Sequence, residues 1–596
     1  MSVAHPFPFA MQRRSSTEGL WNSVIWTCIS LGLGLLVVLA TAMKANAQWP
    51  IDPANPLVIC DDPSEKRNLG IVSDGDGGWI TLWLDNRITT QRFALYGQRT
   101  APDGELLWEP NGRVIMELPG RSVNSYGVAS MSDGNIFLAF ASGADQFGGD
   151  TVRAMAIDVE GQHVWAEPTL LAEPGLLPGG GTSSFHGYPR VARVSNGTFV
   201  GWGTNPIGAA DYVHVARVLN DGTNLMPVQG MEITSLNNSI VTGPWTFRHD
   251  LDGGLLLEER WGNGWGAPLY AMRVDSMGAQ LWPQLLEVSA NSNGLGYEWT
   301  TAVAPTSRVN SIWAFNYELR MAVYDTAGLL LNGSVPIDVC IDPDVQENPF
   351  VVQTDDGSTV FWADNRASAG GGRQVFMQRF DASGTPLLAA NGVQAMQCNG
   401  NLNGFPRAIV AADNSHIVAM FSGTNLMGGT AGFRVGRVTN TGTNLWSDTT
   451  RFCIPAKGPN AGSAYGIVSD GNSGVVAIWY NWEDNALYTA RIDSSGRLGP
   501  DDHTGLEGHG TSARLVVYPN PSSDDVTISI SSGFLGLSAL IELRDATGRI
   551  VHLERVSNLR STQSVVLPAG CTSGVYHLVL RAEDGEMRTA RVVVER

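Results

Sequence analysis

Aromatic residues that could recognise a ligand gather in one glycine-rich segment. Residues 260–266 carry Trp261 and Trp265 between glycines. Exposing two large aromatic rings to water costs free energy, and the flat face of an aromatic ring stacks well on a sugar ring. The segment therefore predicts contact with a glycan. The alternative is that both rings close the axis of the fold or pack between its repeats.

A second candidate is a motif, Trp-x-Asp-Asn-Arg, that occurs twice, as Trp83, Asp85, Asn86 and Arg87 and as Trp362, Asp364, Asn365 and Arg366. A carboxylate and a guanidinium at a strand end can hold a polar ligand or a sugar. The structural alternative is favoured: the aspartate caps the turn, the arginine pairs with it, and the tryptophan packs between repeats. Four further residues are expected to border the same face, namely Tyr317, Glu318, Trp482 and Glu483.

The sequence predicts no metal site, cofactor or catalytic residue. The pairs Asp74/Asp76 and Asp250/Asp252 resemble fragments of calcium loops but lack the full ligand series, and aspartate with glycine is expected in hairpin turns anyway. The ten histidines form no His-x-His or His-Glu-x-x-His motif. A Gly-x-Ser-x-Gly elbow is absent as well.

The elements that position these residues follow from a turn, roughly Asp-x-x-Gly-x-x-Leu-Trp, that the chain repeats eight times. Its glycines are Gly104, Gly161, Gly222, Gly278, Gly328, Gly384, Gly442 and Gly496, which lie 57, 61, 56, 50, 56, 58 and 54 residues apart. Such a regular period indicates units that bury their apolar faces against one another.

Each unit is expected to contain four strands. In the first unit these are residues 68–73, 79–84, 93–99 and 113–118, joined by tight turns of aspartate and glycine. Four-stranded units repeated radially form a β-propeller. We therefore predict an all-β protein with an eight-bladed propeller at residues 48–498. A seven-bladed ring is the alternative if the weak unit at residues 297–335 is not a full blade.

The eighth unit lacks its own fourth strand, because Gly496 is followed by Pro500, Asp501 and Asp502. Residues 56–60, at the other end of the chain, resemble the fourth strand at residues 336–340. We therefore predict that residues 56–60 complete the last blade and close the ring, which removes two exposed sheet edges.

Six cysteines in an exported protein normally suggest disulfides. Four of them occupy the same position, near the end of a fourth strand: Cys60, Cys340, Cys398 and Cys453. Equivalent positions in neighbouring blades lie beyond the reach of about 7 Å that a disulfide allows. We therefore predict separate buried thiols.

The ends of the chain and its charge bear on location. Arg13 and Arg14 precede an apolar run at residues 24–43, and Ala47 ends a small-x-small cleavage pattern, so residues 1–47 are predicted to be a signal peptide. The alternative is an uncleaved anchor. The net charge of −19 disfavours nucleic acid as a partner.

Residues 499–512 are small and polar, which predicts a linker, and residues 513–596 are expected to form a small β-sandwich of short strands. This last region carries the motifs Tyr518-Pro519-Asn520-Pro521, Asp545-x-x-Gly548-Arg549, Leu567-Pro568-x-Gly570 and Ser573-Gly574-x-Tyr576-x-Leu578. The motifs resemble the type A C-terminal sorting domain of cargo of the type IX secretion system. Cys571 and Thr572 depart from the pattern and lengthen one loop.

The resemblance implies export to the outer cell surface or the medium, with the type IX machinery as a partner. Contact with a membrane is expected only through the signal peptide or an anchor attached after export. For the propeller we expect a binding role, with an extracellular glycan or protein as the partner. The alternatives are a carbohydrate-active enzyme, either a glycoside hydrolase or a lyase, and a purely structural surface protein.

Overall fold

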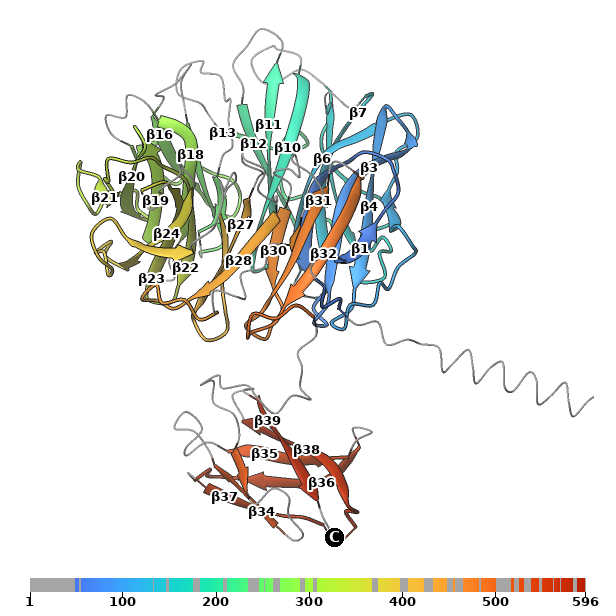
Figure 1. Ribbon diagram of the computed structural model, residues 1–596. Coiled ribbons are helices and arrows are strands. Elements are labelled where there is room, and N and C mark those ends of the chain that lie inside the picture. The colour runs from blue at the N-terminus through green and yellow to red at the C-terminus, as the bar shows by residue number, and fades with distance from the viewer. Residues whose placement is uncertain are drawn as a thin grey trace, which may run out of the picture. The chain divides into compact units, whose positions relative to one another are not determined.

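The computed structural model describes residues 49–52, 55–131, 133–145, 149–174, 183–206, 212–233, 246–250, 252–260, 268–289, 295–303, 308–366, 373–396, 406–422, 432–446, 454–455, 465–481, 484–499, 516–518, 525–529, 538–545, 549–560, 562–568, 570–582 and 587–594. Within these ranges every regular element is a β-strand (Figure 1). The chain divides into two compact units, Met1–Asp502 and His503–Arg596. The predicted all-β class is confirmed.

The described strands of the first unit form eight antiparallel sheets of four strands each, numbered here as sheets 1 to 8. Sheet 1 contains β2 (Lys66–Ser73), β3 (Trp79–Thr89), β4 (Arg92–Thr100) and β5 (Arg113–Met116), and sheet 2 contains β6 (Ser122–Ser130), β7 (Ile136–Gly143), β8 (Thr151–Ile157) and β9 (Thr169–Ala172). Sheet 3 contains β10 (Ser183–Val194), β11 (Gly197–Pro206), β12 (Tyr212–Val218) and β13 (Met231–Ile233), and sheet 4 contains β14 (Thr246–His249), β15 (Leu255–Arg260), β16 (Leu269–Val274) and β17 (Leu286–Glu287).

Sheet 5 contains β18 (Leu295–Val303), β19 (Arg308–Phe315), β20 (Glu318–Asp325) and β21 (Ile337–Cys340), and sheet 6 contains β22 (Gln346–Thr354), β23 (Gly357–Asp364), β24 (Gln374–Asp381) and β25 (Val393–Met396). Sheet 7 contains β26 (Arg407–Val410), β27 (His416–Ser422), β28 (Gly432–Val438) and β29 (Ile454–Pro455). Sheet 8 contains β30 (Tyr465–Ser469), β31 (Val475–Asn481), β32 (Ala486–Ile492) and, from the start of the chain, β1 (Leu57–Cys60).

The first strands of successive sheets lie against one another in cyclic order. Each contacts the first strand of the sheet before and after it, and β30 of sheet 8 contacts β2 of sheet 1. Side chains between the sheets form separate apolar clusters. In one of them, Leu82 of sheet 1 packs with Ile136 and Leu138 of sheet 2. Full burial of such a side chain is worth about 1.5–3 kcal/mol, so the sheets stabilise one another.

The strand predicted at residues 56–60 is β1, and it pairs with β32 of sheet 8. The pairing is antiparallel, with Leu57 opposite Thr489 and Val58 opposite Tyr488. The last sheet of the first unit therefore takes its outer strand from the N-terminal end of the chain.

The repeated turn links each sheet to the next. The tryptophan of one turn packs on the glycine of the following turn, where a Cβ atom would come within about 3 Å of the ring in several cases. The indole N–H groups donate to carbonyls of the neighbouring turn: Trp108 to Val159 at 3.3 Å, Trp165 to Asn220 at 3.1 Å, Trp282 to Thr326 at 2.9 Å and Trp446 to Ser494 at 3.1 Å. The glycine is required both for this close approach and for its positive φ, which is 75° at Gly161.

Trp49 takes the same role between sheets 8 and 1. Its side chain is 1% exposed, packs on Gly104 and meets the Trp79 ring edge to face, with 5.9 Å between ring centroids. Its indole N–H donates to the Pro102 carbonyl at 2.8 Å. The N-terminal segment thus supplies both a strand and a turn residue to the eighth sheet.

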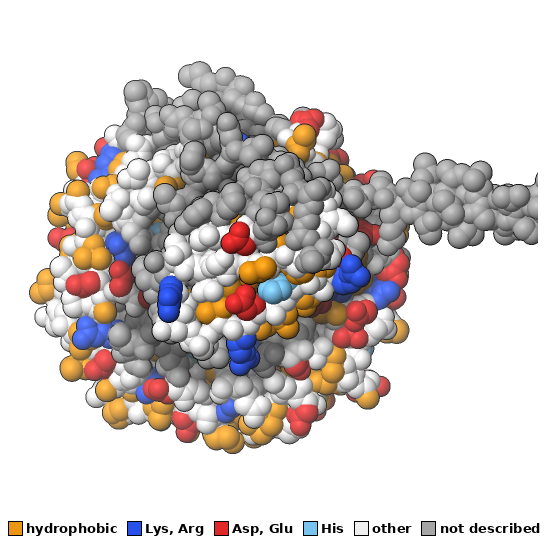
Figure 2. Space-filling view, turned by 90° about the horizontal axis from the view of Figure 1, so that it is seen from below, with side chains coloured by type: hydrophobic (Ala, Val, Ile, Leu, Met, Phe, Trp, Pro, Cys, Tyr) orange, Lys and Arg blue, Asp and Glu red, His pale blue; other side chains and the backbone are white. Residues whose placement is uncertain are grey.

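The repeated turns also place aliphatic side chains on the surface. The residue three positions after the glycine is 40–46% exposed in six turns, at Leu107, Val164, Leu281, Leu331, Leu387 and Leu445. Figure 2 shows hydrophobic side chains dispersed among acidic and basic ones on the described part of the face that is seen. Exposed aliphatic residues dispersed in this way are normal for a soluble surface.

The second unit contains two sheets. The first contains β33 (Val516–Tyr518), β34 (Asp525–Ser529) and β37 (Thr562–Val566), and the second contains β35 (Ala539–Arg544), β36 (Ile550–Val556), β38 (Gly574–Ala582) and β39 (Met587–Val594). Side chains of both sheets share one apolar core that includes Val526, Ile541 and Leu578.

The predicted signal peptide, with Ala47, lies outside the described residues, as does nearly all of the predicted linker. In the described part of the chain, no helix has the length and hydropathy that crossing a membrane requires.

Candidate functional site

The first Trp-x-Asp-Asn-Arg motif builds a buried network at the end of β3. Asp85 is fully buried and accepts hydrogen bonds from the indole of Trp83 at 3.0 Å and from the backbone N–H of Arg87 at 2.9 Å. The Arg87 guanidinium pairs with the same carboxylate at 2.6 Å and lies 4.1 Å from the centroid of the Tyr96 ring. The carboxylate is therefore used to hold the turn.

The second copy of the motif makes the same contacts at the end of β23. Trp362 donates to Asp364 at 2.8 Å, and the Arg366 backbone N–H donates to it at 3.0 Å. The Arg366 guanidinium lies 2.9 Å from the carboxylate and 4.0 Å from the centroid of the Phe376 ring. Sheets 1 and 6 thus each build the same network with the same geometry, so the motif has a structural role in both.

The network also fixes the connection from the preceding sheet. Asn86 accepts the backbone N–H of Glu65 at 2.9 Å, and Asn365 accepts that of Val345 in the same way at 2.9 Å. Asn86 lies in the second strand β3 and Asn365 directly follows the second strand β23, while both donors lie in the segment that leads from one fourth strand to the next first strand. The motif thus joins sheet 8 to sheet 1 and sheet 5 to sheet 6.

Burial and hydrogen bonding act in opposite directions on the two carboxylates. Burial disfavours the charged form of Asp85, but hydrogen bonds from Arg87, Ser64 and Trp83 outweigh it, and the pKa of Asp85 is lowered. In Asp364 burial dominates and the pKa is raised, although Arg366 and Trp362 oppose it. Two residues distinguish the networks: the Ser64 hydroxyl donates to Asp85 at 2.6 Å and the Lys66 ammonium lies 3.9 Å from it, whereas the sixth sheet has Asp344 and Gln346 at these places.

Two of the predicted thiols lie beside these networks. Cys60 and Cys340 are buried and unpaired, as predicted, and the Arg87 guanidinium donates to the Cys60 sulfur at 3.2 Å. Burial raises the pKa of Cys60, and it raises the pKa of Cys340 to about 11. Both thiols are therefore protonated and unreactive near neutral pH. Cys398 and Cys453 lie outside the described residues, and Cys571 is a third buried free thiol.

Tyr317 is the predicted aromatic residue that the structure does expose. It lies in the two-residue turn between β19 and β20, where Asn316 and Tyr317 have φ values of 48° and 66°, and its side chain is 64% exposed. Its carbonyl accepts the backbone N–H of Gln346 at 3.0 Å, so the turn contacts the connection into sheet 6. Glu318 pairs with Arg320.

In sheet 8, too, the turn between the second and third strands contacts a connection between sheets. Asn485, between β31 and β32, donates to the Pro63 carbonyl at 3.0 Å. Turns between second and third strands therefore share one end of the sheets with the connections between sheets, as predicted. We call this end the loop face. Four of the predicted site residues lie outside the described residues, namely Trp261, Trp265, Trp482 and Glu483.

The aspartates that resemble calcium loops form hairpin turns. Asp74 accepts the backbone N–H groups of Asp76 and Gly78 through one oxygen, and its other oxygen pairs with Arg99 at 2.8 Å. Asp250 makes the equivalent contacts, including an ion pair with Arg273 at 2.8 Å. Among the described residues no group of three or more metal-ligating side chains comes together.

Glu258 of β15 is a buried carboxylate that sequence reasoning missed. It is fully buried and accepts hydrogen bonds from the hydroxyls of Thr301, Tyr324 and Ser311, the last at 3.0 Å, all from sheet 5. Burial raises its pKa to about 7, against these hydrogen bonds and the charge of Arg248. The sequence carried one signal for this residue. Glu258 occupies the position in β15 that the apolar Leu82 occupies in β3 of sheet 1, so a charged residue stands where another repeat has an apolar one.

In the second unit, Tyr518 ends β33, and Gly574 and Tyr576 lie in β38. The Tyr576 hydroxyl accepts the Thr572 backbone N–H at 3.0 Å and donates to its carbonyl at 3.1 Å, so it ties down the lengthened loop. The other predicted sorting residues, Pro519, Asn520, Pro521 and Gly548, lie outside the described residues.

Comparison with known families identifies the second unit. Residues 516–595 match the secretion system C-terminal sorting domain, which confirms the resemblance stated above. Export to the cell surface or the extracellular medium, and interaction of this unit with the type IX secretion machinery, follow from that match. A comparison with curated proteins gave no match.

Solved structures with some similarity include a protein of unknown function from Dyadobacter fermentans, with 11% identity, a TM-score of 0.31 and coverage of 54% of this chain and 95% of that chain. Prolyl oligopeptidase B from Galerina marginata has 13% identity, a TM-score of 0.39 and coverage of 71% and 56%. An α-L-arabinofuranosidase from Lactobacillus brevis has 9% identity, a TM-score of 0.26 and coverage of 46% and 95%. These scores are too low to carry an argument about activity.

Proposed function

Because a sorting domain directs this chain out of the cell, we propose that its first unit is an extracellular binding module. In this proposal the eight sheets are the blades of a closed eight-bladed β-propeller, the second unit is a small β-sandwich, and the loop face recognises a glycan or a protein. The domains keep the predicted limits, with a signal peptide at residues 1–47, the propeller at 48–498 and the sorting domain at 513–596.

The cyclic contact order of the first strands supports a closed ring. The four strands of sheet 5, β18 to β21, support eight blades rather than seven, and the pairing of β1 with β32 gives the last sheet its fourth strand. A ring closed in this way leaves only short outer edges, which suits a protein that must stay soluble outside the cell.

The observation that carries the binding role is the conformation of Tyr317. The two-residue turn requires positive φ at Asn316 and Tyr317, which strains the tyrosine by about 1–3 kcal/mol, and strained residues of this kind cluster at functional sites. Here the strained residue is an exposed aromatic ring on a tight turn of the loop face. A rigid aromatic ring loses little entropy on binding, which is why such residues anchor ligands.

The burial of the carboxylates in the two repeated motifs also supports a binding role. Hydrolysis of a glycoside needs two accessible carboxylates roughly 5–10 Å apart. Asp85 and Asp364 are instead fully buried and hydrogen-bonded within the turns. Both carboxylates therefore hold the turns in place, and this favours recognition over catalysis at this face.

The test is a glycan-array and polysaccharide pull-down screen with the mature chain. We expect binding that weakens about tenfold or more in Tyr317→Ala and in the double variant Trp261→Ala, Trp265→Ala, since loss of one stacked ring costs about 1–3 kcal/mol. Leu281→Ala, which changes an exposed residue in the turn at the opposite end of sheet 4, is the control. Ligand binding that all three variants retain would contradict the assignment of the loop face.

A further inference from the structure

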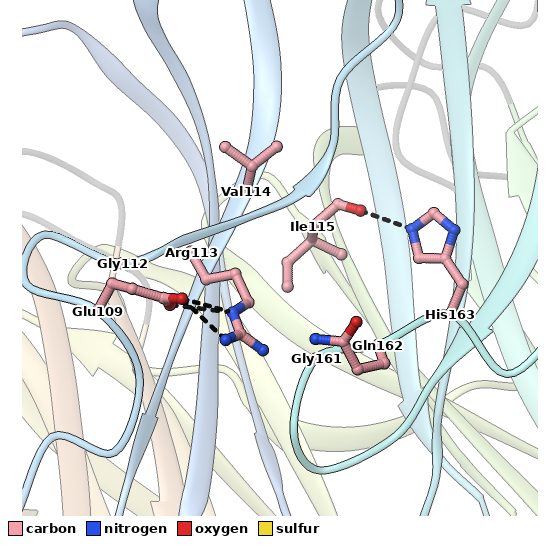
Figure 3. Close-up of a pocket in the computed structure, with 8 residues that line it drawn as sticks. All are labelled: Glu109, Gly112, Arg113, Val114, Ile115, Gly161, Gln162 and His163. Carbon is pink, nitrogen blue, oxygen red and sulfur yellow. Dashed lines mark hydrogen bonds and ion pairs between the residues drawn. The ribbon is translucent and has the colours of Figure 1, made fainter. Parts of the chain in front are cut away.

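A groove of about 670 Å³ runs between the outer edge of sheet 1 and the repeated turn of sheet 2. One wall is β5 with the preceding residues from Glu109, and the other is the turn Gly161–His163 (Figure 3). This turn joins third and fourth strands, so the groove lies at the end of the sheets opposite the loop face. Its volume falls within the range of ligand-binding clefts.

One wall presents a fixed pair of opposite charges. The Arg113 guanidinium contacts the Glu109 carboxylate at 2.8–3.2 Å, and it also donates to the Glu160 carbonyl. Its carbon Cζ lies 5.9 Å from the centroid of the Trp108 ring. These contacts hold the guanidinium in place and leave the pair without net charge.

The other wall presents polar groups with unused hydrogen-bonding capacity. His163 Nε2 lies 2.9 Å from the Ile115 carbonyl, which can only accept, so Nε2 carries the proton and Nδ1 is left as an acceptor. The Gln162 side chain makes no hydrogen bond to another described residue, and Figure 3 shows its amide between the Arg113 guanidinium and the His163 ring. The amide adds both a donor and an acceptor.

The other repeats of this chain show that these polar groups are not needed to join two sheets. At the positions of Glu109, Arg113, Gln162 and His163, the junction of sheets 3 and 4 has Pro227, Met231, Ala279 and Gln280. The junction of sheets 6 and 7 has Ala389, Val393, Thr443 and Asn444. In those junctions Met231 and Val393 pack on the next glycine with carbon atoms, as Arg113 does on Gly161 through its Cδ, so this contact does not need the guanidinium.

We propose that this groove binds a neutral oligosaccharide. The four side chains offer donors and acceptors together, which is what hydroxyl groups on a sugar chain require. The ion pair cancels its own charge, and the chain as a whole carries −19, so the surroundings disfavour an anionic ligand. This site is separate from the loop face and does not depend on the function proposed for it.

The experiment measures binding of soluble neutral oligosaccharides, with xylohexaose, cellohexaose and laminarihexaose as probes, to the mature full-length chain by calorimetry. We expect binding of at least one probe, and a loss of about tenfold in affinity for Gln162→Ala and for Glu109→Ala, because each removes one or more hydrogen bonds to the sugar. Thr443→Ala, at the position of Gln162 in the junction of sheets 6 and 7, should bind as the unchanged protein does.

Three results would overturn the proposal: no probe binds, binding survives both groove variants, or an acidic oligogalacturonate binds more tightly than every neutral probe. The double variant Trp261→Ala, Trp265→Ala separates the two faces. If it abolishes binding while Gln162→Ala does not, the sugar site is at the loop face and the groove is not used. Unchanged melting temperatures of the exposed-site variants show that the fold is intact.

Discussion

At the scale of single residues, this protein uses its buried carboxylates to connect sheets. Asp85 and Asp364 each hold a turn, an indole and a guanidinium, but only in Asp85 do the hydrogen bonds outweigh the effect of burial on the pKa. Glu258 is different because its donors are three neutral hydroxyl groups of the next sheet. Burial outweighs these three hydrogen bonds and the charge of Arg248, so the pKa of Glu258 is raised.

This raised pKa predicts a pH dependence of stability. The pKa of Glu258 is about 7 in the folded protein and near its ordinary value of 4.5 in the unfolded chain. The folded state therefore binds the extra proton between these values, and its stabilisation, about 3 kcal/mol at most, is lost as the pH rises through 7. We expect Glu258→Gln to remove this loss. Urea denaturation at pH 5 and pH 8.5 measures it.

The expected outcome is that the free energy of unfolding of the Glu258→Gln variant, relative to the unchanged protein, is higher at pH 8.5 than at pH 5. Groups elsewhere titrate equally in both proteins, so the difference isolates Glu258. An equal difference at the two pH values would show that the carboxyl is not buried as described.

At the scale of the elements, the turn that the chain repeats is a contact between neighbouring sheets. Its tryptophan packs on the glycine of the next turn, and Trp49 supplies this contact to Gly104 of sheet 1, because the eighth repeat has Pro500 at the position of the tryptophan. The number of sheets, their hairpins and the strand at residues 56–60 could all be predicted from spacing and turn chemistry. Trp49 could not, because it lies outside the period and has no aspartate or glycine before it to mark it.

Because Trp49 and Trp108 each pack on the glycine of the next turn, we predict that Trp49→Ala and Trp108→Ala have similar effects on stability. Each removes a buried indole and one hydrogen bond, so each should lower the free energy of unfolding of the first unit by about 3–5 kcal/mol. Urea denaturation followed by far-UV circular dichroism measures both. Exposed Leu107→Ala is the matched control from the same turn. A Trp49→Ala variant as stable as the control would contradict the assigned role.

At the scale of the whole molecule, closure depends on the N-terminal segment. The repeat spacing predicts a ring, but which candidate site residues come together depends on side-chain contacts between neighbouring sheets. Arg87 illustrates this limit, since its partners include Cys60 of the preceding sheet as well as Asp85 of its own. The groove at Gln162 was missed for the same reason: its walls come from two repeats, and neither carries a recognisable motif.

Removal of residues 48–60 is predicted to cause self-association. The deletion exposes the edge of β32 and the Trp79 ring that Trp49 covers, and an open sheet edge pairs readily with another chain. Size-exclusion chromatography with light scattering should show dimers or larger species. A chain that begins at Trp49 keeps the whole segment and should be monomeric. A monomeric deletion variant would show that β1 is dispensable for closure.

The pairing of the two ends of the first unit also determines when, during synthesis, this unit can complete its folding. The N-terminal strand is among the first parts of the mature protein to be synthesised, yet its partner strand comes from the last repeat. Pro63 and Asn485, which bond to each other, are separated by 422 positions. Until β32 has been synthesised, β1 has no partner strand and the eighth sheet is incomplete. Folding of the first unit is therefore completed only when synthesis has almost reached the sorting domain, which begins near residue 516.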